Sequence, residues 1–268
     1  MGRLALRPAL RAYAHAPAAA ADEELVNTLS VYLDGVEDSL YHYDAGGAGL
    51  PDSSAGYTVA GWVKWVGPYN GTYPYPFLVN RQNDGSGAWH YDNTITFMSN
   101  SVLSSIYTYG KVYTSSAYDR ADSNTGHFDD DTTWVFVCGR AAPSDNIYMN
   151  IDGADDDSDT TGTIAFATTS FDNASKAMFT FGSQLYDSLY VMKCKLNNWT
   201  VWERCLSLVE VQTLRNGGTP ADPTTLGLGN PYAWYKFGNG AAIGTDEMGN
   251  MDLSSNGDPT TVSDVPPT

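Results

Sequence analysis

The chain has few of the residue types that carry metal, nucleophilic or cofactor chemistry. Its 268 residues include three cysteines and four histidines, and the cysteines show no C-x-x-C spacing, so a zinc site is not expected. No G-x-S-x-G lies near a histidine, and neither a P-loop nor a G-x-G-x-x-G follows an expected strand, which argues against serine hydrolases and nucleotide-binding enzymes. No apolar run approaches the roughly 20 residues that cross a bilayer, so we expect no membrane span.

Glutamate is also scarce, and this bears on glycoside hydrolysis. The six glutamates are Glu23, Glu24, Glu37, Glu203, Glu210 and Glu247. A retaining glycosidase needs two facing carboxylates about 5 Å apart, which on one strand would appear as alternating acids. None of the six lies in such an array, and adjacent Glu37 and Asp38 would point to opposite faces of a strand. We therefore expect no catalytic residues and no enzymatic activity.

Positive charge is in short supply. The chain has 14 lysines and arginines against 31 aspartates and glutamates, a net charge of −17. Phosphate groups would be repelled, so nucleic acid is excluded as an expected partner. The same charge favours solubility and the attraction of divalent cations.

The three cysteines are expected to be structural. Cys138 ends the apolar run Trp134–Cys138, which indicates a small buried side chain. A disulfide between Cys194 and Cys205 is an open alternative to two free thiols.

Residues 1–27 differ from the rest of the chain and are predicted to form a basic, alanine-rich arm before a domain at 28–268. Arg3, Arg7 and Arg11 recur every four residues, and no acid occurs before Asp22. Pro8 interrupts any continuous helix, and no unbroken apolar stretch follows the arginines, so the segment lacks a recognisable secretion signal. An organelle transit peptide is one alternative. The other, which we favour, is an arm that lies on the acidic surface of a neighbouring subunit.

After the arm, the chain is predicted to consist of strands and tight turns, in keeping with 18 tyrosines, 7 tryptophans and 26 glycines. The expected strands are Ser30–Asp38, Tyr57–Val66, Phe77–Arg81, Ala88–Met98, Ser105–Tyr113, Thr133–Arg140, Asn146–Asp152, Thr163–Thr168, Ala177–Gly182, Ser188–Lys195, Pro231–Gly238 and Thr260–Val265. The pair at 133–152 is typical of a hairpin. More than ten closely spaced strands with one helix predict an all-β, two-sheet antiparallel jelly-roll sandwich.

The single expected helix begins at Ser207. Ser207 and Glu210 fit the capping box S-x-x-E, and Arg215 suits the negative end of the helix dipole. Asn216-Gly217-Gly218 indicates a left-handed stop. The sequence thus predicts one short helix near the C-terminal end.

An acidic segment at Gly153–Thr161 is the best candidate for a calcium site. Asp155, Asp157, Asp159 and Thr161 stand at alternate positions, as do the first four ligands of a calcium-binding loop. The match fails at the sixth position, where Thr160 replaces glycine, and at the twelfth. A second cluster follows at Asp129-Asp130-Asp131. The alternative for both is a solvated turn at a strand end.

Two aromatic loops are candidates for glycan binding, because sugar rings stack on exposed aromatic side chains with polar neighbours. Their residues are Tyr69, Tyr73, Tyr75, Trp89, Tyr91 and Asp92. Turn packing or a subunit contact is the alternative interpretation.

Taken in order, these segments resemble the laminin-G-like, concanavalin A-like jelly-roll family. SVYLDGVEDSL resembles its opening strand, YTVAGWVKW its tryptophan-bearing core strand, and TTWVFVCGR with NIYMNIDG its hairpin. The segment CKLNNWTVWERCLSLVEVQTLRNGG resembles the family's strand-and-helix motif. The positions that match are Trp202, Arg204, Leu206, Ser207, Glu210 and Leu214. Cys194 replaces the usual glycine, and Asn197 or Asn198 the usual acid. The resemblance covers residues 28–265 and implies the jelly-roll fold, with calcium binding in many members.

The last segment is similar to the C-terminal tail of laminin-G-like proteins in tailed-phage virions. The matching positions are Trp234, Gly238, Asn239, Gly240, Asp246, Gly249, Asn250, Asp252, Leu253, Asn256, Gly257, Asp264, Val265 and Pro266. This resemblance implies a non-enzymatic structural or decoration protein on a virion surface. Its arm would anchor it to capsid or tail subunits, as a homo-oligomer that also adheres to host glycans. The alternatives are a free-standing lectin-like carbohydrate-binding module and, less favoured, a β-glucanase-type glycoside hydrolase.

Overall fold

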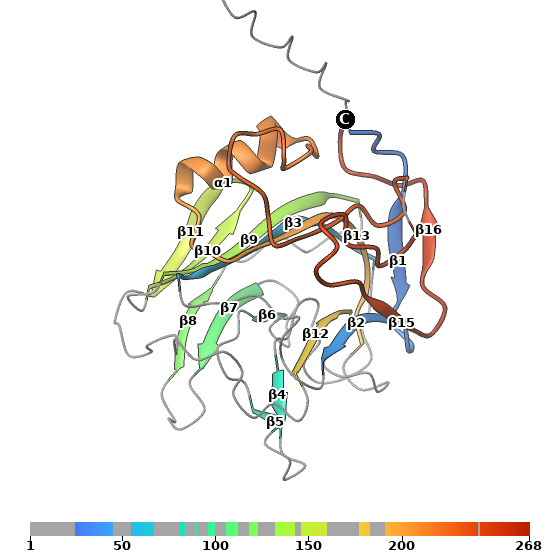
Figure 1. Cartoon of the computed structure of the whole chain (residues 1–268), viewed down its shortest axis with the longest axis horizontal. Coiled ribbons are helices and arrows are strands. Elements are labelled where there is room, and N and C mark those ends of the chain that lie inside the picture. The colour runs from blue at the N-terminus through green and yellow to red at the C-terminus, as the bar shows by residue number, and fades with distance from the viewer. Residues whose placement is uncertain are drawn as a thin grey trace, which may run out of the picture.

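The fold comes from a computed structural model (Figure 1). The structure describes residues 25–44, 55–66, 81–83, 89–90, 96–99, 106–111, 118–122, 132–142, 146–159, 177–182, 191–240 and 242–268. Side chains are not described at 43–44, 81–83, 89–90, 96–99, 106–111, 118–120, 122, 155–159 and 177–178. Residues 1–24 of the predicted arm, with Arg3, Arg7 and Arg11, lie outside the described residues.

The described residues form strands with one short helix, as predicted. The strands in the first half are β1 Ser30–Asp34, β2 Ser39–Asp44, β3 Tyr57–Trp65, β4 Arg81–Asn83, β5 Trp89–His90, β6 Thr96–Ser99, β7 Ile106–Lys111 and β8 Tyr118–Asp122. Those in the second half are β9 Trp134–Ala141, β10 Ile147–Ile151, β11 Ala154–Asp159, β12 Ala177–Phe181, β13 Lys193–Trp202, β14 Ala233–Tyr235, β15 Ser254–Asn256 and β16 Thr260–Val262. The helix is α1, Leu208–Arg215, followed by the 3-10 turn η1, Asn216–Gly218.

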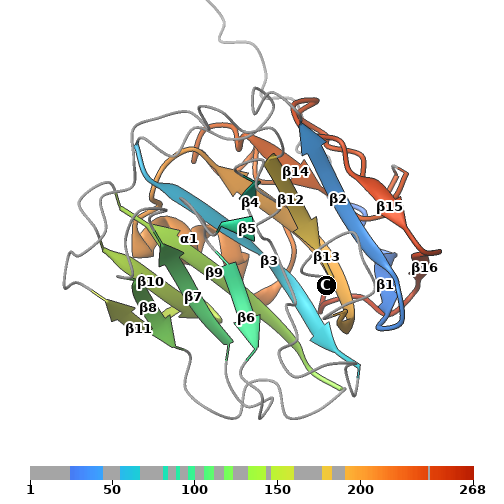
Figure 2. The same ribbon diagram turned by 90° about the horizontal axis from the view of Figure 1, so that it is seen from below.

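The strands lie in two layers, which confirms the jelly-roll sandwich (Figures 1 and 2). The large sheet has the order β11-β10-β9-β3-β13-β1-β16, with β14 also paired to β13. The opposite layer, called here the smaller sheet, consists of β15-β2-β12-β4-β5 and β6-β7-β8. Every printed strand pair is antiparallel. Some sequence neighbours, such as β1 and β2, lie in different layers, whereas β9, β10 and β11 are adjacent in the large sheet.

The strand β3 shows how side-chain alternation builds two apolar layers from one sheet. Val59 and Val63 point into the inner core between the sheets, whereas Ala60 and Trp62 belong to a second cluster on the outer face. Gly61 lies under the indole of Trp199, where an added Cβ would sit 2.3 Å from the ring. Burial on both faces explains why this strand is a nearly continuous apolar run.

The inner core is rich in aromatic rings. Its largest fully buried members are Trp199, Tyr235, Phe179, Phe181 and Phe237. Phe181 makes edge-to-face contacts with Trp199 and Phe237, at centroid distances of 5.3 and 5.4 Å. These rings join β12 of the smaller sheet to β13 and β14 of the large sheet, so they hold the two layers together.

The turn at Asp152-Gly153 corrects the predicted acidic loop. Both residues have positive φ, 51° and 79°, which is the backbone of a two-residue hairpin turn that Asp-Gly favours. The chain therefore reverses directly after β10 and continues as β11. Asp157 and Asp159 pair with Met149 and Ile147 of β10. The segment with Asp155, Asp157 and Asp159 is thus an edge strand of the large sheet, and not the loop that the calcium interpretation assumed.

Other strand predictions were wrong in their boundaries. The predicted run Ser30–Asp38 is broken by a turn, where Gly35 has a φ of 78°, and the chain then enters β2. The predicted strand Ser188–Lys195 extends to Trp202 in β13. The predicted strand Ala88–Met98 overlaps β5 and β6, and residues 91–95 between them lie outside the described residues. The hairpin of β9 and β10 is confirmed.

Candidate functional site

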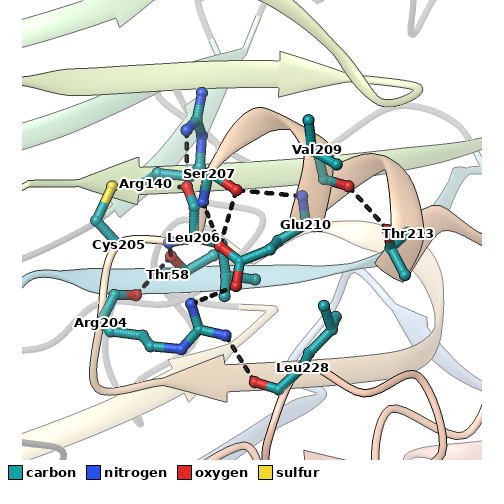
Figure 3. Close-up of polar contacts among 10 residues, drawn as sticks. All are labelled: Thr58, Arg140, Arg204, Cys205, Leu206, Ser207, Val209, Glu210, Thr213 and Leu228. Atoms are coloured by element: carbon teal, nitrogen blue, oxygen red, sulfur yellow. Dashed lines mark hydrogen bonds and ion pairs between the residues drawn. The ribbon is translucent and has the colours of Figure 1, made fainter.

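The start of α1 is closed by the predicted capping box (Figure 3). The Ser207 amide donates to Glu210 Oε2 at 2.8 Å, and the Glu210 amide donates to Ser207 Oγ at 3.4 Å. Arg204 Nη1 donates to Glu210 Oε1 at 2.8 Å, and its Nη2 donates to the Leu228 carbonyl at 2.7 Å. Burial would raise the pKa of Glu210, but the hydrogen bonds from Ser207 and Arg204 outweigh it and lower that pKa. The carboxylate therefore remains ionised and ties the helix to both flanking segments.

A second polar group fixes the same segment to the large sheet. The buried Arg140 of β9 donates from Nε to Asn150 Oδ1 at 2.8 Å and from Nη1 to the Leu206 carbonyl at 2.7 Å. Thr58 Oγ1 donates to the Arg204 carbonyl and accepts from the Leu206 amide. The motif around Arg204 therefore attaches α1 to the large sheet.

Apolar side chains fill the space between α1 and the sheet. This outer cluster consists of Ala60, Trp62, Trp134, Phe136, Cys138, Trp202, Leu206, Val211 and Leu214. Trp62 and Phe136 meet edge to face at 5.4 Å, and α1 lies across the face that they form (Figure 1). This part of the outer face is closed to a ligand.

The C-terminal tail closes the adjacent part of the outer face through Asp264. Its carboxylate is 2.9 Å from Lys64 Nζ, accepts from Trp134 Nε1 at 3.0 Å, and pairs with Lys195. These residues come from β3, β9 and β13, three consecutive strands of the sheet. Burial would raise the pKa of Asp264, but hydrogen bonds from Lys195, Lys64 and Trp134 outweigh it and bring the pKa to about 2.

Other matched positions of the tail also have structural contacts. The buried Asp246 carboxylate accepts four backbone amides, from Trp234, Met248, Asn250 and Met251, at 2.8–2.9 Å. Such full pairing fixes a loop and leaves no free lone pair directed at a ligand. Asn239 likewise accepts the amides of Thr28 and Leu29 ahead of β1. The residues that match the tail pattern therefore hold the tail in place.

The two sheets differ in how far described helices and strands cover their outer faces. Seen from below, its strands face the viewer, and no described helix or strand lies in front of them (Figure 2). The strand β5 pairs only with β4 among the described strands and forms one edge of the five-stranded part. We take the outer face of this sheet as the candidate binding face.

The predicted glycan residues are only partly placed. Trp89 lies in β5, at the edge of the candidate face. Tyr69, Tyr73, Tyr75, Tyr91 and Asp92 lie outside the described residues. Whether these six residues form one surface therefore stays a prediction.

The predicted metal residues cannot be assigned a site. Thr161 and the cluster Asp129-Asp130-Asp131 lie outside the described residues, and the side chains of Asp155, Asp157 and Asp159 are not described. Among the side chains that are described, no three His, Cys, Asp or Glu residues gather as metal ligands. Calcium remains a prediction.

The cysteines are free thiols, which excludes the Cys194–Cys205 disulfide in this structure. Cys138 and Cys194 are buried. The burial of Cys138 was predicted from the apolar run that it ends. Burial raises the pKa of Cys194 and of Cys205, so neither is an activated nucleophile.

Sequence reasoning missed a polar cleft at the end of β13. It has a volume of 260 Å³ and is lined in part by Glu203, Asn230, Tyr232 and Asn250. Its residues come from the end of β13, from the segment before β14 and from the tail, so no local motif could have indicated it.

In the part of the chain that the structure describes, no helix has the length and apolar character needed to cross a membrane.

Comparison with known proteins identifies the fold of the chain and does not identify its function. No protein-family model and no curated protein sequence matches the chain. A protein of Bacteroides ovatus described as carbohydrate-binding is similar in structure, with a TM-score of 0.58 and 12% identity, over 90% of this chain and 62% of that one. The chain thus spans less than two thirds of that protein.

Two further structures are similar over most of their own length. A heptameric SAP-like pentraxin of Limulus polyphemus has a TM-score of 0.51 and 11% identity, over 84% of this chain and 98% of that chain. The CBM40 module of a Ruminococcus gnavus IT-sialidase, bound to α2,3-sialyllactose, has a TM-score of 0.50 and 9% identity, over 69% and 95%. At these identities the likeness establishes the jelly-roll fold alone.

Proposed function

We propose that this chain is a non-enzymatic carbohydrate-binding jelly roll, whose glycan site lies on the outer face of the smaller sheet. The observation that carries the proposal is the unequal cover of the two sheets. The outer face of the large sheet is closed by α1, the outer cluster and the Asp264 contacts, whereas no described element covers the smaller sheet (Figure 2). Two of the similar structures carry names that state carbohydrate binding.

Two of the described glutamates, Glu210 and Glu247, have structural partners, which favours a binding role over hydrolysis. Glu210 is paired with Arg204, and Glu247 lies 3.1 Å from Lys236. Both carboxylates are held in ion pairs within the fold, so neither is free to act as the proton donor that glycoside hydrolysis needs.

A glycan array probed with the full-length chain tests the proposal. We expect binding above background to at least one glycan, with no cleavage of that glycan after prolonged incubation. No binding to any glycan would contradict the proposal, and release of free sugar would contradict its non-enzymatic part.

A second candidate function is a role on the surface of a virion, which the tail favours. Its matched residues Asp246, Asp264 and Asn239 each hold the tail in place, as expected if the tail resembles those of phage laminin-G-like proteins. In that case the arm joins the jelly roll to capsid or tail subunits. Reversing the charge of Arg3, Arg7 and Arg11 to Glu in the full chain should abolish assembly with them. Unchanged incorporation would contradict this role.

Calcium binding is the third part of the proposal and rests on the acids of β11. Asp155, Asp157 and Asp159 lie on one edge strand, where a neighbouring segment could complete an oxygen-ligand set. If they bind calcium, EDTA should lower the melting temperature by about 5 °C. The double variant Asp155→Asn, Asp157→Asn should show no such difference; an EDTA effect of the same size in that variant would contradict the assignment.

A further inference from the structure

The chain contains four Asn-Gly pairs, and three of them lie among the described residues. These three are Asn216-Gly217, Asn239-Gly240 and Asn256-Gly257, whereas Asn70-Gly71 lies outside the described part. In an Asn-Gly pair the amide carbon of the asparagine side chain can meet the next backbone nitrogen, which glycine leaves without a shielding side chain. The restraint that the fold places on each pair therefore decides which of them reacts.

Asn216 follows the last residue of α1 and is weakly restrained. The residue is exposed, and both Asn216 and Gly217 have positive φ, 52° and 68°. Among the described residues, its side chain bonds with Thr219 alone, through Nδ2 and Thr219 Oγ1 at 3.1 Å. A Cβ placed on Gly217 would meet no other part of the chain within 4 Å. Since helix ends fray, this peptide can rotate with few contacts to break.

Asn239 is restrained most. It lies inside the fold and is only 6% exposed. Its Oδ1 accepts the amides of Thr28 and Leu29 at 2.7 and 2.6 Å. Its Nδ2 donates to the carbonyls of Leu29 and Lys236. A rotation of the amide group would break these bonds, so the fold protects this pair.

Asn256 is held by strand pairing. It lies in β15, opposite Ser39 of β2, and its Nδ2 donates to the Glu37 carbonyl at 3.1 Å. Gly257 packs against Asp38, whose side chain a Cβ at that position would overlap. Reaction at this pair therefore requires β15 to separate from β2.

The reaction at an exposed Asn-Gly pair needs only water. The backbone nitrogen of Gly217 gives up its proton and bonds to Cγ of Asn216, while the Cγ–Nδ2 bond breaks and ammonia leaves with that proton. A water molecule then opens the cyclic imide. Cleavage between the ring nitrogen and Cγ gives aspartate, and cleavage between the ring nitrogen and the main-chain carbonyl carbon gives isoaspartate. In total, water is consumed and ammonia is released, with no change of oxidation state.

We propose that Asn216 is a modification site, where the chain deamidates spontaneously and the neutral end of α1 gains a carboxylate. Asn239 and Asn256 belong to the same type of pair and stay intact in the folded chain, because the fold restrains them. The proposal is independent of the carbohydrate function.

Deamidation weakens the end of α1 in two ways. Both products place a negative charge at the C-terminal end of the helix, where the dipole disfavours it. Isoaspartate also lengthens the main chain by a methylene group and displaces the Asn216 carbonyl, which accepts the Thr219 amide at 3.3 Å. Asn216 and Asp222 line the same pocket of 260 Å³, so the reaction adds an acid to a lining that already holds Asp222.

The test is to incubate the folded, full-length chain at pH 8 in ¹⁸O-labelled water and to map its peptides by mass spectrometry. Asn216 should deamidate at least about tenfold faster than Asn239 and Asn256, because its pair reacts without an opening of the fold. An isoaspartate methyltransferase should label the Asn216 peptide. Equal rates at the three pairs, or a faster rate at Asn239 or Asn256, would overturn the proposal.

Unfolding and a matched variant separate the effect of the fold from that of the local sequence. In concentrated urea the three rates should become similar, and a preference for Asn216 that persists there would overturn the proposal. Asn216→Gly suits the left-handed backbone and cannot deamidate. After the same incubation the melting temperature of wild type should fall, whereas that of Asn216→Gly should not. An equal fall in both proteins would contradict the role of Asn216.

Discussion

The two sheets of this sandwich carry very different outer faces. The large sheet is covered by apolar packing at α1 and by an ion-pair cluster at Asp264, and the capping-box and tail motifs beside it make structural contacts. The smaller sheet has no described helix or strand in front of it (Figure 2). The comparison shows that the most recognisable motifs of this chain consist of residues that stabilise the fold. On the proposed function, recognition of a ligand lies on the outer face of the smaller sheet.

The largest expected effect comes from removing a ring under α1. Trp62→Ala should lower the free energy of unfolding by about 3–5 kcal/mol, because it leaves a cavity beneath the helix and removes the contact with Phe136. Urea unfolding measures the loss. Val209→Ala is the matched control, since Val209 is on the same helix but 70% exposed, and it should change stability by less than about 0.5 kcal/mol. Equal losses in both variants would mean that α1 does not cover a packed cluster.

Asp264→Asn should remove the ion pairs between the tail and the large sheet, and the resulting loss of stability should depend on pH. The folded pKa of Asp264 is about 2, against an ordinary value of 3.8. Its ionised form therefore stabilises the fold fully above pH 4, and this contribution disappears as the pH falls toward 2. With the side chain one third exposed, we expect about 1–2 kcal/mol at pH 7 after allowing for solvent screening.

Unfolding of wild type and Asp264→Asn at pH 7, 4, 3 and 2 gives the check. The difference between them should be largest at pH 7 and should vanish near pH 2, while Glu37→Gln should track wild type throughout. A difference independent of pH would contradict the ionic origin.

A smaller effect is expected at the helix cap. Ser207→Ala removes the acceptor for the Glu210 amide and should cost about 1 kcal/mol. Ser207→Asp restores an acceptor and should recover most of the loss in thermal unfolding. If Ser207→Asp is as unstable as Ser207→Ala, the cap does not hold the start of α1.

Trp89→Ala should have the smallest effect on stability and the clearest effect on binding. On the proposed function, it should change the free energy of unfolding by less than about 0.5 kcal/mol, yet weaken binding of the array-selected glycan at least tenfold by calorimetry. A destabilised variant with normal glycan affinity would place Trp89 in the core and remove it from the binding face.

The two-sheet sandwich, the β9–β10 hairpin and the helix ends were predictable, whereas several strand boundaries and the strand β11 were not. The box Ser207–Glu210 and the left-handed Asn216 involve residues within one turn, so their spacing alone fixes the helix ends. The acidic strand β11 was missed because aspartate is rare in strands. Its conformation is set by the Asp152-Gly153 turn and by pairing with β10.

The candidate site was predicted only in part, because its residues are brought together by strand pairing and not by their spacing in the sequence. Trp89 was chosen as an aromatic residue in a turn-rich stretch, and the structure places it on an edge strand. The cleft at the end of β13 is lined in part by Glu203, Asn230 and Asn250, which are far apart in the chain and form no local motif. The pairing of β13 with β14 and the return of the tail bring them together.

Hydrogen–deuterium exchange with and without the array-selected glycan tests the central claim most directly. If the binding face is the outer face of the smaller sheet, saturating glycan should slow exchange in residues 81–90, which hold β4 and β5, and leave α1 and residues 260–266 unchanged. Protection confined to α1 and the tail, with none in residues 81–90, would contradict the account.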